Sequence, residues 1–140
     1  MYCVVDASIA AAWVAQDEKG KITDAILDLV EREGAFVPDL FWHEIRNILL
    51  KLERRGRSKP GDAEVAMGRL RDLSLTVSAC SEDRILLEIA RAHNLSAYDA
   101  SYLDVAIRSA HPLATADRRL TAGAKACGVV VLGPYAGPTP

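Results

Sequence analysis

Short apolar runs alternate along this chain with longer stretches in which apolar residues recur at helical spacing. The apolar runs predict five strands, at residues 2–5, 35–37, 75–78, 113–115 and 129–132. Because nearly every position in these runs is apolar, they are typical of strands that a sheet buries on both faces. Strands that alternate with helices in this way predict an α/β fold with a parallel sheet and right-handed crossovers.

Helical spacing is clearest between Ile22 and Val30, where apolar residues follow the i, i+3, i+4, i+7, i+8 pattern of an amphipathic helix. Further helices are predicted at residues 41–52, 60–73, 85–90 and 118–127. No internal repeat or linker is visible in the sequence, so we expect a single domain over residues 1–140. Its tail, residues 134–140, is rich in glycine and proline, and we expect it to fray.

One further helix, predicted at residues 95–110, carries acidic residues on two different sides. Asp104 shares the polar side with Arg108, four residues on, and we expect both to face water. Asp99 instead falls within the apolar arc. Because Ser96 precedes it by three residues, Asp99 could belong to a capping box and face the amides of the first helical turn. The alternative is a functional carboxylate, and the rest of the chain has to decide between them.

The composition suits one globular domain with its own core, since the chain has 140 residues, half of them hydrophobic, and a net charge of −2. No apolar run approaches the roughly 20 residues of a membrane span, and the first residues, MYCVVDAS, lack the basic region of a signal peptide. Three widely spaced cysteines are typical of free thiols in a reducing compartment. We therefore expect a cytoplasmic protein without a membrane partner, whose mild acidity still permits local contact with nucleic acid.

Four acidic residues are predicted to lie at strand ends or helix starts. Asp6 ends the first strand run, and Asp117 follows the fourth. Asp99 begins the helix that leads to the fourth strand, and Glu44 lies shortly after the second strand. Because ligands bind to parallel sheets beyond the carboxyl ends of the strands, this fold can bring the four acids to one edge.

Four carboxylates in one crevice repel each other, and some of them take up protons unless a cation neutralises their charge. Hard cations such as Mg²⁺ prefer oxygen ligands, and two such ions form the clamp that hydrolyses phosphodiesters. This chemistry requires carboxylates but no histidine or cysteine. It agrees with the lack of metal-ligand spacing among His43, His93 and His111.

Four blocks of the sequence resemble PIN-domain ribonucleases, and closely the VapC-like toxins of bacterial and archaeal toxin–antitoxin operons. The blocks follow the family order and together extend over essentially the whole chain: VVDASIAAAW, VPDLFWHEIRNIL, LSAYDASYLDVA and PLATADRRL. The resemblance implies a three-layer PIN-like fold, in which helices flank a five-stranded parallel sheet of order 3-2-1-4-5. Strand one would then lie beside strand four.

The resemblance also implies a function. It points to a Mg²⁺- or Mn²⁺-dependent endoribonuclease, with one or two ions per site, that cleaves RNA by metal-activated water. The family's catalytic and metal-binding quartet matches Asp6, Glu44, Asp99 and Asp117. Its supporting polar positions match Ser8, Asn47 and Thr115. Family members are usually homodimers, and a cognate VapB-like antitoxin silences them.

Two alternatives stay open at this stage. A PIN-domain nuclease of RNA maturation, not paired with an antitoxin, would share the same chemistry. A metal-dependent adhesion module without catalysis requires the pattern Asp-x-Ser-x-Ser, of which residues 6–10 supply two of the three positions because they end in Ala10.

A dense basic patch follows the helix predicted at residues 41–52, and we define it by Arg54, Arg55, Arg57 and Lys59. It has two open interpretations: it contacts the RNA backbone, or it consists of ordinary cations at a helix C-terminus and in a solvated turn. Three aromatic residues are expected in the core or at a dimer surface rather than under RNA bases: Trp13, Phe41 and Trp42.

Overall fold

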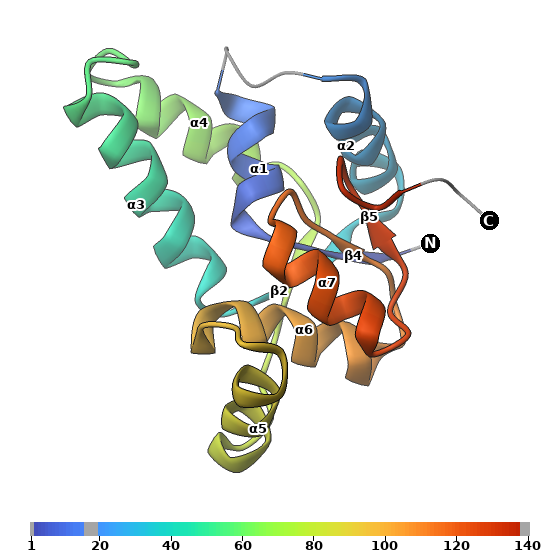
Figure 1. Ribbon diagram of the computed structural model, residues 1–140. Helices are drawn as coiled ribbons and strands as arrows, with labels where there is room; N and C mark the ends of the chain where they lie inside the picture. Colours follow the sequence, from blue (N-terminus) through green and yellow to red (C-terminus); the bar gives the residue numbers. More distant parts are fainter. Residues whose placement is uncertain (1, 16–19, 138–140) are drawn as a thin grey trace.

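The computed structural model describes residues 2–15 and 20–137 (Figure 1). Its sheet has five parallel strands in the order β3-β2-β1-β4-β5. The strands are β1 (Cys3–Val5), β2 (Ala35–Pro38), β3 (Leu75–Ser78), β4 (Leu113–Ala114) and β5 (Val131–Leu132). The α/β class, the parallel sheet and the predicted strand order are therefore confirmed.

Helices cover both faces of this sheet. The helices are α1 (Ala7–Val14), α2 (Lys21–Glu33), α3 (Phe41–Arg54), α4 (Asp62–Arg71), α5 (Asp83–His93), α6 (Ala97–Ser109) and α7 (Arg118–Ala126). With right-handed crossovers, this connectivity puts α1 to α4 on one face and α5 to α7 on the other. The contacts agree, because α1 packs against α2 and α3, whereas α6 packs against β1, β2, β4, α5 and α7. The result is the expected three-layer arrangement, with β1 at its centre.

Helix α1 is absent from the helices that apolar spacing predicts. Its sequence, ASIAAAWV, is apolar on nearly every side, so it has no polar face from which a helical period can be recognised. Six of its eight residues are buried, and α2 and α3 pack against it. Because α1 begins directly after β1, its N-terminus lies at the carboxyl edge of the sheet.

The expected exposure of Asp104 is wrong. Asp104 is 1% exposed, and its carboxylate accepts hydrogen bonds from the backbone amide (2.9 Å) and the hydroxyl (2.5 Å) of Ser81. Arg108 pairs with it at 3.1 Å, as the four-residue spacing predicts, and also donates to the Ala79 carbonyl. The sequence pattern misplaces Asp104 because the β3–α5 connection covers the side of α6 that the pattern assigns to water. Helical spacing also places Tyr98 on the apolar side of this helix, whereas the structure leaves it 65% exposed.

The end of the chain continues past β5 along α7. Lys125 of α7 donates to the Tyr135 carbonyl (3.3 Å), and the Arg118 guanidinium lies 4.4 Å from the Tyr135 ring centroid. These contacts involve the first part of the tail that the sequence predicts to fray, residues 134–137, whereas residues 138–140 lie outside the described residues. None of the helices within residues 2–15 and 20–137 has the length and apolar character needed to cross a membrane.

Candidate active site

Asp6 lies at the carboxyl end of β1, in the centre of the sheet. Its amide donates to the Ala114 carbonyl (3.1 Å), so pairing between β1 and β4 extends one residue beyond β1. Its carboxylate accepts a hydrogen bond from the Ile9 amide (3.1 Å) and thereby caps α1. Asp6 is 4% exposed, so the sheet edge and the start of α1 together enclose a carboxylate.

Two hydroxyl groups hold the Asp6 carboxylate by both of its oxygens. Ser8 Oγ donates to Oδ1 and Thr115 Oγ1 donates to Oδ2, each at 2.5 Å. The same two hydroxyls accept hydrogen bonds from the amides of Ala116 and Asp117, each at 3.0 Å. Ser8 and Thr115, the two hydroxyl positions that the resemblance assigns, therefore connect Asp6 to the segment after β4 that carries Asp117.

Asp117 stands at the same edge, one strand away from Asp6. It is the N-cap residue of α7, where its Oδ1 accepts a hydrogen bond from the Leu120 amide (2.8 Å). Within residues 2–15 and 20–137, its Oδ2 accepts no hydrogen bond. One oxygen thus serves the helix, and the other is left for a ligand.

Asp99 lies half-buried in the first turn of α6. Ser96 is the N-cap residue, and its hydroxyl accepts a hydrogen bond from the Asp99 amide (3.1 Å), which is the N-cap half of the predicted capping box. Burial raises the pKa of Asp99, the negative charge of Asp117 raises it further, and a hydrogen bond with Ser96 lowers it. The starts of α6 and α7 therefore bring two like charges within electrostatic reach of each other.

Glu44 approaches the same edge from the first turn of α3, where it is half-buried. Its Oε1 accepts a hydrogen bond from the hydroxyl of Tyr102 at 2.7 Å. Burial raises the pKa of Glu44, the Tyr102 hydrogen bond lowers it, and the charge of Asp99 raises it. Tyr102 is not among the site residues that the sequence predicts. Two signals were available, because Tyr102 follows Asp99 by one helical turn and a buried tyrosine hydroxyl usually has a hydrogen-bond partner.

We call the site formed by Asp6, Glu44, Asp99 and Asp117 the acidic edge, and its like charges repel one another. Burial raises the pKa of Asp6 to about 6 against the lowering effect of its hydrogen bonds, and the charge of Asp99 raises it further. Asp99 acts in the same way on Glu44, and Asp117 acts on Asp99. In the part of the chain that the structure describes, no lysine or arginine forms an ion pair with any of the four.

This donor set suits a hard divalent cation in its chemistry, because all four side chains offer carboxylate oxygens. Their unbalanced negative charge favours such a cation as well. The side chains as they stand do not form a finished metal site, since no three His, Cys, Asp or Glu residues among those described converge closely enough to hold an ion. Repulsion favours this spread arrangement, and a cation would draw the carboxylates together.

Other residues that the sequence singles out lie along or beyond α3. Asn47 is exposed, one turn after Glu44. The basic patch is exposed at the far end of α3, and Arg54 follows Glu44 by ten residues, or about 15 Å of helix. The structure therefore does not bring the basic patch to the acidic edge.

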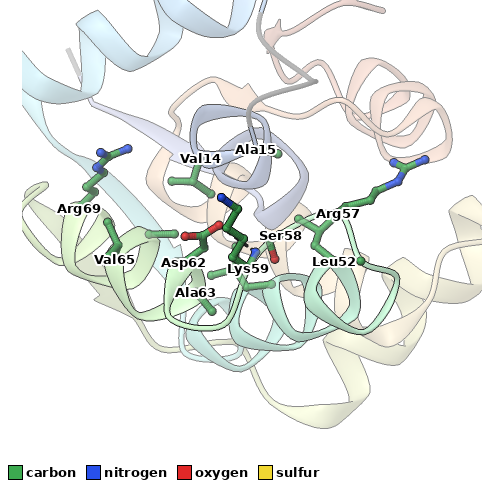
Figure 2. A pocket seen from close by; sticks show the side chains of 13 residues that line it. Val14, Ala15, Leu52, Arg57, Ser58, Lys59, Asp62, Ala63, Val65 and Arg69 are labelled. Atoms are coloured by element: carbon green, nitrogen blue, oxygen red, sulfur yellow. Dashed lines mark hydrogen bonds between the residues drawn. The ribbon is translucent and has the colours of Figure 1, made fainter.

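A pocket of about 630 Å³ opens beside the basic patch, between the C-terminal ends of α1 and α3 and the first two turns of α4. Figure 2 shows Lys59 and Asp62 near its centre, below Val14, with Arg57 and Arg69 extending outward on its two sides. Val14 ends α1, at the opposite end of that helix from Asp6. The pocket and the acidic edge therefore lie at opposite ends of α1 and α3.

Two of the three aromatic residues are in the core, as predicted. Phe41 is fully buried, and Trp13 is buried with its indole N–H donating to the Thr23 carbonyl (2.9 Å). Trp42 is half-buried, edge-on against Phe41, with the Arg71 guanidinium 3.6 Å from the centroid of its ring. That ring face is therefore covered by the protein itself.

Comparison with known proteins agrees with this geometry. The sequence matches the PIN domain family over residues 3–126. It is 36% identical over 131 residues to VapC ribonuclease Mb0985 of Mycobacterium bovis, covering 92% of this chain and 97% of that protein. It is 28% identical over 123 residues to Ribonuclease VapC3 of Pyrobaculum aerophilum, covering 86% and 92%. The crystal structure of PAE2754 from Pyrobaculum aerophilum is similar, with a TM-score of 0.71 and 27% identity, over 94% of this chain and 88% of that one. The strand order, the acidic edge and these matches lead to one conclusion: the chain belongs to the PIN-domain family, as a VapC-like member.

Proposed function

We propose that this protein is a Mg²⁺- or Mn²⁺-dependent endoribonuclease that acts as the toxin of a toxin–antitoxin pair. The observation that carries the proposal is the acidic edge itself. Its four carboxylates lie at the end of β1, on α3, on α6 and at the start of α7, and none of them forms an ion pair with a described lysine or arginine. An oxygen-only donor set suits metal-dependent phosphodiester hydrolysis. The relatives named as VapC ribonucleases support RNA as the substrate and an antitoxin as the partner.

The quartet Asp6, Glu44, Asp99 and Asp117 would hold one or two ions. Such an ion lowers the pKa of a water molecule and offsets the charge of the scissile phosphate. The chain's own part is to hold the carboxylates in place before RNA arrives. Ser8 and Thr115 fix Asp6 by both oxygens, and the cap of α7 fixes one oxygen of Asp117. Asn47 and the basic patch would support binding of RNA as it passes along α3.

The proposal is tested by incubating the purified protein with RNA in Mg²⁺ or Mn²⁺, and in EDTA. We expect endonucleolytic cleavage that requires the metal and leaves 5′-phosphate and 3′-hydroxyl ends. Cleavage that survives EDTA, or 2′,3′-cyclic phosphate ends, would contradict this mechanism. Protein of the Asp6→Asn variant, prepared in the same way, controls for contaminating ribonuclease.

Single substitutions then test the quartet itself. Each of Asp6→Asn, Glu44→Gln, Asp99→Asn and Asp117→Asn is expected to lose nearly all cleavage. Asp28→Asn, which alters an exposed acid on α2, is expected to cleave like wild type. A variant of the quartet with wild-type activity would remove that residue from the site.

An antitoxin partner distinguishes the toxin role from the alternative role in RNA maturation. Expression of the protein alone is expected to arrest growth, and co-expression with a small protein encoded next to it is expected to restore growth and block cleavage. A protein that cuts RNA but neither arrests growth nor binds such a partner would favour the maturation nuclease. Size-exclusion chromatography of the same preparations tests the expected homodimer.

A further inference from the structure

We propose that Tyr102 is a positioning residue that holds the Glu44 carboxylate at the acidic edge, an inference that rests on the proposed function. The Tyr102 hydroxyl donates to Glu44 Oε1 at 2.7 Å. Tyr102 belongs to α6 and Glu44 to α3, and these helices cover opposite faces of the sheet. The bond therefore joins the two helical layers just beyond the carboxyl ends of the strands, where the acids gather.

The bond is the only hydrogen bond to the Glu44 carboxylate among the described residues. Asp99 repels Glu44, and a glutamate side chain has several rotatable bonds through which it can move away from a like charge. Donation to Oε1 opposes that movement. It leaves Oε2 without a hydrogen bond from the described chain, so one oxygen is anchored and the other is free for a ligand.

Tyr102 is suited to holding Glu44 because its hydroxyl is buried and donates directly to the carboxylate. Tyr102 is 1% exposed. Burial raises its pKa far above the usual value, and the hydrogen bond and charge of Glu44 and the charge of Asp6 raise it further, while the Ala7 amide acts in the opposite direction. The geometry assigns the roles in this bond, because a phenol hydroxyl carries a proton at neutral pH and an ionised carboxylate can only accept.

If the role of Tyr102 were purely structural, its contribution would come from packing of its ring, which lies in the core. Tyr102→Phe keeps the ring and removes only the hydroxyl oxygen, so it separates the two parts. A matched control lies one turn earlier on the same helix. Tyr98→Phe makes the same substitution at a side chain that is 65% exposed.

The experiment measures Mn²⁺ affinity by calorimetry on metal-free protein, and it measures kcat and KM for RNA cleavage. Five proteins are compared: wild type, Tyr102→Phe, Tyr98→Phe, Glu44→Gln and the Tyr102→Phe/Glu44→Gln double variant. Loss of a group that orients a metal ligand typically costs 10- to 100-fold in metal affinity or activity. We expect a loss of about that size in Mn²⁺ affinity and kcat for Tyr102→Phe, with KM little changed. We expect no loss for Tyr98→Phe, and the double variant should bind Mn²⁺ no more weakly than Glu44→Gln. Thermal unfolding in EDTA, followed by circular dichroism, establishes that each variant is folded.

Each other outcome has a defined meaning. Wild type that neither binds Mn²⁺ nor cleaves RNA overturns the proposed function and this inference with it. Wild type that does both, together with Tyr102→Phe that equals it, overturns the inference alone. A further loss in the Glu44→Gln background shows that Tyr102 does not act through Glu44, and a Tyr102→Phe variant that fails to fold shows that the hydroxyl serves the fold; both results overturn the inference.

Discussion

The carboxylate of Asp6 has a full set of hydrogen bonds in an environment that disfavours its charge. Ser8, Thr115 and the Ile9 amide stabilise the ionised form, yet burial outweighs them, so the pKa of Asp6 is about 6 rather than the usual 3.8. A bound cation would favour the ionised form. In its absence, the ionised group strains the folded state.

This shift makes stability depend on pH in a defined direction. Because the folded-state pKa is raised, the contribution of Asp6 is fully present below about pH 4 and is lost as the pH rises through about 6. The shift corresponds to about 3 kcal/mol at 1.36 kcal/mol per pKa unit. In EDTA, we expect the unfolding free energy of wild type to fall relative to Asp6→Asn by up to about that amount between pH 4 and 7. Urea unfolding of both proteins, followed by circular dichroism at each pH, measures it, and parallel pH curves would contradict it.

Asp104 shows the opposite electrostatic balance on the same helix as Asp99. Burial raises its pKa, but the two hydrogen bonds from Ser81 and the bond and charge of Arg108 outweigh burial and lower it. A lowered pKa means that Asp104 stabilises the fold at neutral pH and that this stabilisation is lost as the pH falls through the folded-state pKa. Asp104 thus ties the β3–α5 connection to α6.

Asp104→Ala is therefore expected to destabilise the protein without touching the chemistry. Loss of the carboxylate leaves the Ser81 amide and hydroxyl without their acceptor, which costs about 1–3 kcal/mol. Cleavage per folded molecule should stay unchanged, because Asp104 makes none of its contacts at the acidic edge. Urea unfolding and RNA cleavage are compared with those of Asp28→Ala, an exposed control. Loss of cleavage in a folded Asp104→Ala protein would show that its network reaches the site.

At the scale of elements, four helices begin at the acidic edge, and Glu44 lies in the first turn of one of them, α3. Asp6 caps α1, Asp117 caps α7, and Asp99 lies in the first turn of α6 behind its Ser96 cap. The positive ends of helix dipoles favour nearby negative charge. The four N-termini therefore offset part of the repulsion among the carboxylates, which form no ion pair within residues 2–15 and 20–137.

At Asp117, two substitutions distinguish the effect of the negative charge from the effect of capping α7. Asp117→Asn keeps an oxygen that can accept from the Leu120 amide, whereas Asp117→Ala removes it. In EDTA, we expect Asp117→Asn to match or exceed wild type in melting temperature, because it removes a repelling charge, and Asp117→Ala to lose about 0.5–2 kcal/mol relative to Asp117→Asn. Both should lose cleavage, and Mg²⁺ should raise the melting temperature of wild type more than that of either variant. Equal melting temperatures for the two variants would mean that the cap contributes nothing to stability.

At the scale of the whole molecule, acidic and basic groups lie at opposite ends of α1 and α3. The acidic edge lies at the start of both helices, and the basic patch and its pocket lie at their ends. RNA that reached both would extend along α3. We therefore expect the basic patch to influence RNA binding rather than chemistry.

The salt dependence of RNA binding tests whether the basic patch contacts RNA. Replacing Arg54, Arg55 and Arg57 by glutamine should reduce the slope of log K against log salt by about 2, at ~0.7 per phosphate contact on single strands. The matched control replaces three exposed cations of α2, α5 and α7 by glutamine: Arg32, Arg91 and Lys125. Binding is measured with the Asp6→Asn protein to prevent cleavage. An unchanged slope in the patch variant would assign these cations to the helix C-terminus and the solvated turn.

Local patterns determined the class of fold and the identity of the acids. Buried parallel strands require continuous apolar runs, and amphipathic helices require a 3.6-residue period, so both are legible along the chain. The positions of Asp6 and Asp117 after strand runs put them at the carboxyl edge before any contact was known. Family resemblance supplied the strand order, which the structure confirms.

Only the tertiary structure determined which parts of the chain pack against each helix face. Helix α1 has no polar face to reveal it, and Asp104 is buried because a connection from elsewhere in the chain covers it. The hydrogen bond between Tyr102 and Glu44 joins residues 58 positions apart, and the bond between Thr115 and Asp6 joins residues 109 apart. Periodicity reports which residues share a face of one element, whereas burial and hydrogen bonding depend on the second element that packs against that face, which no local window contains.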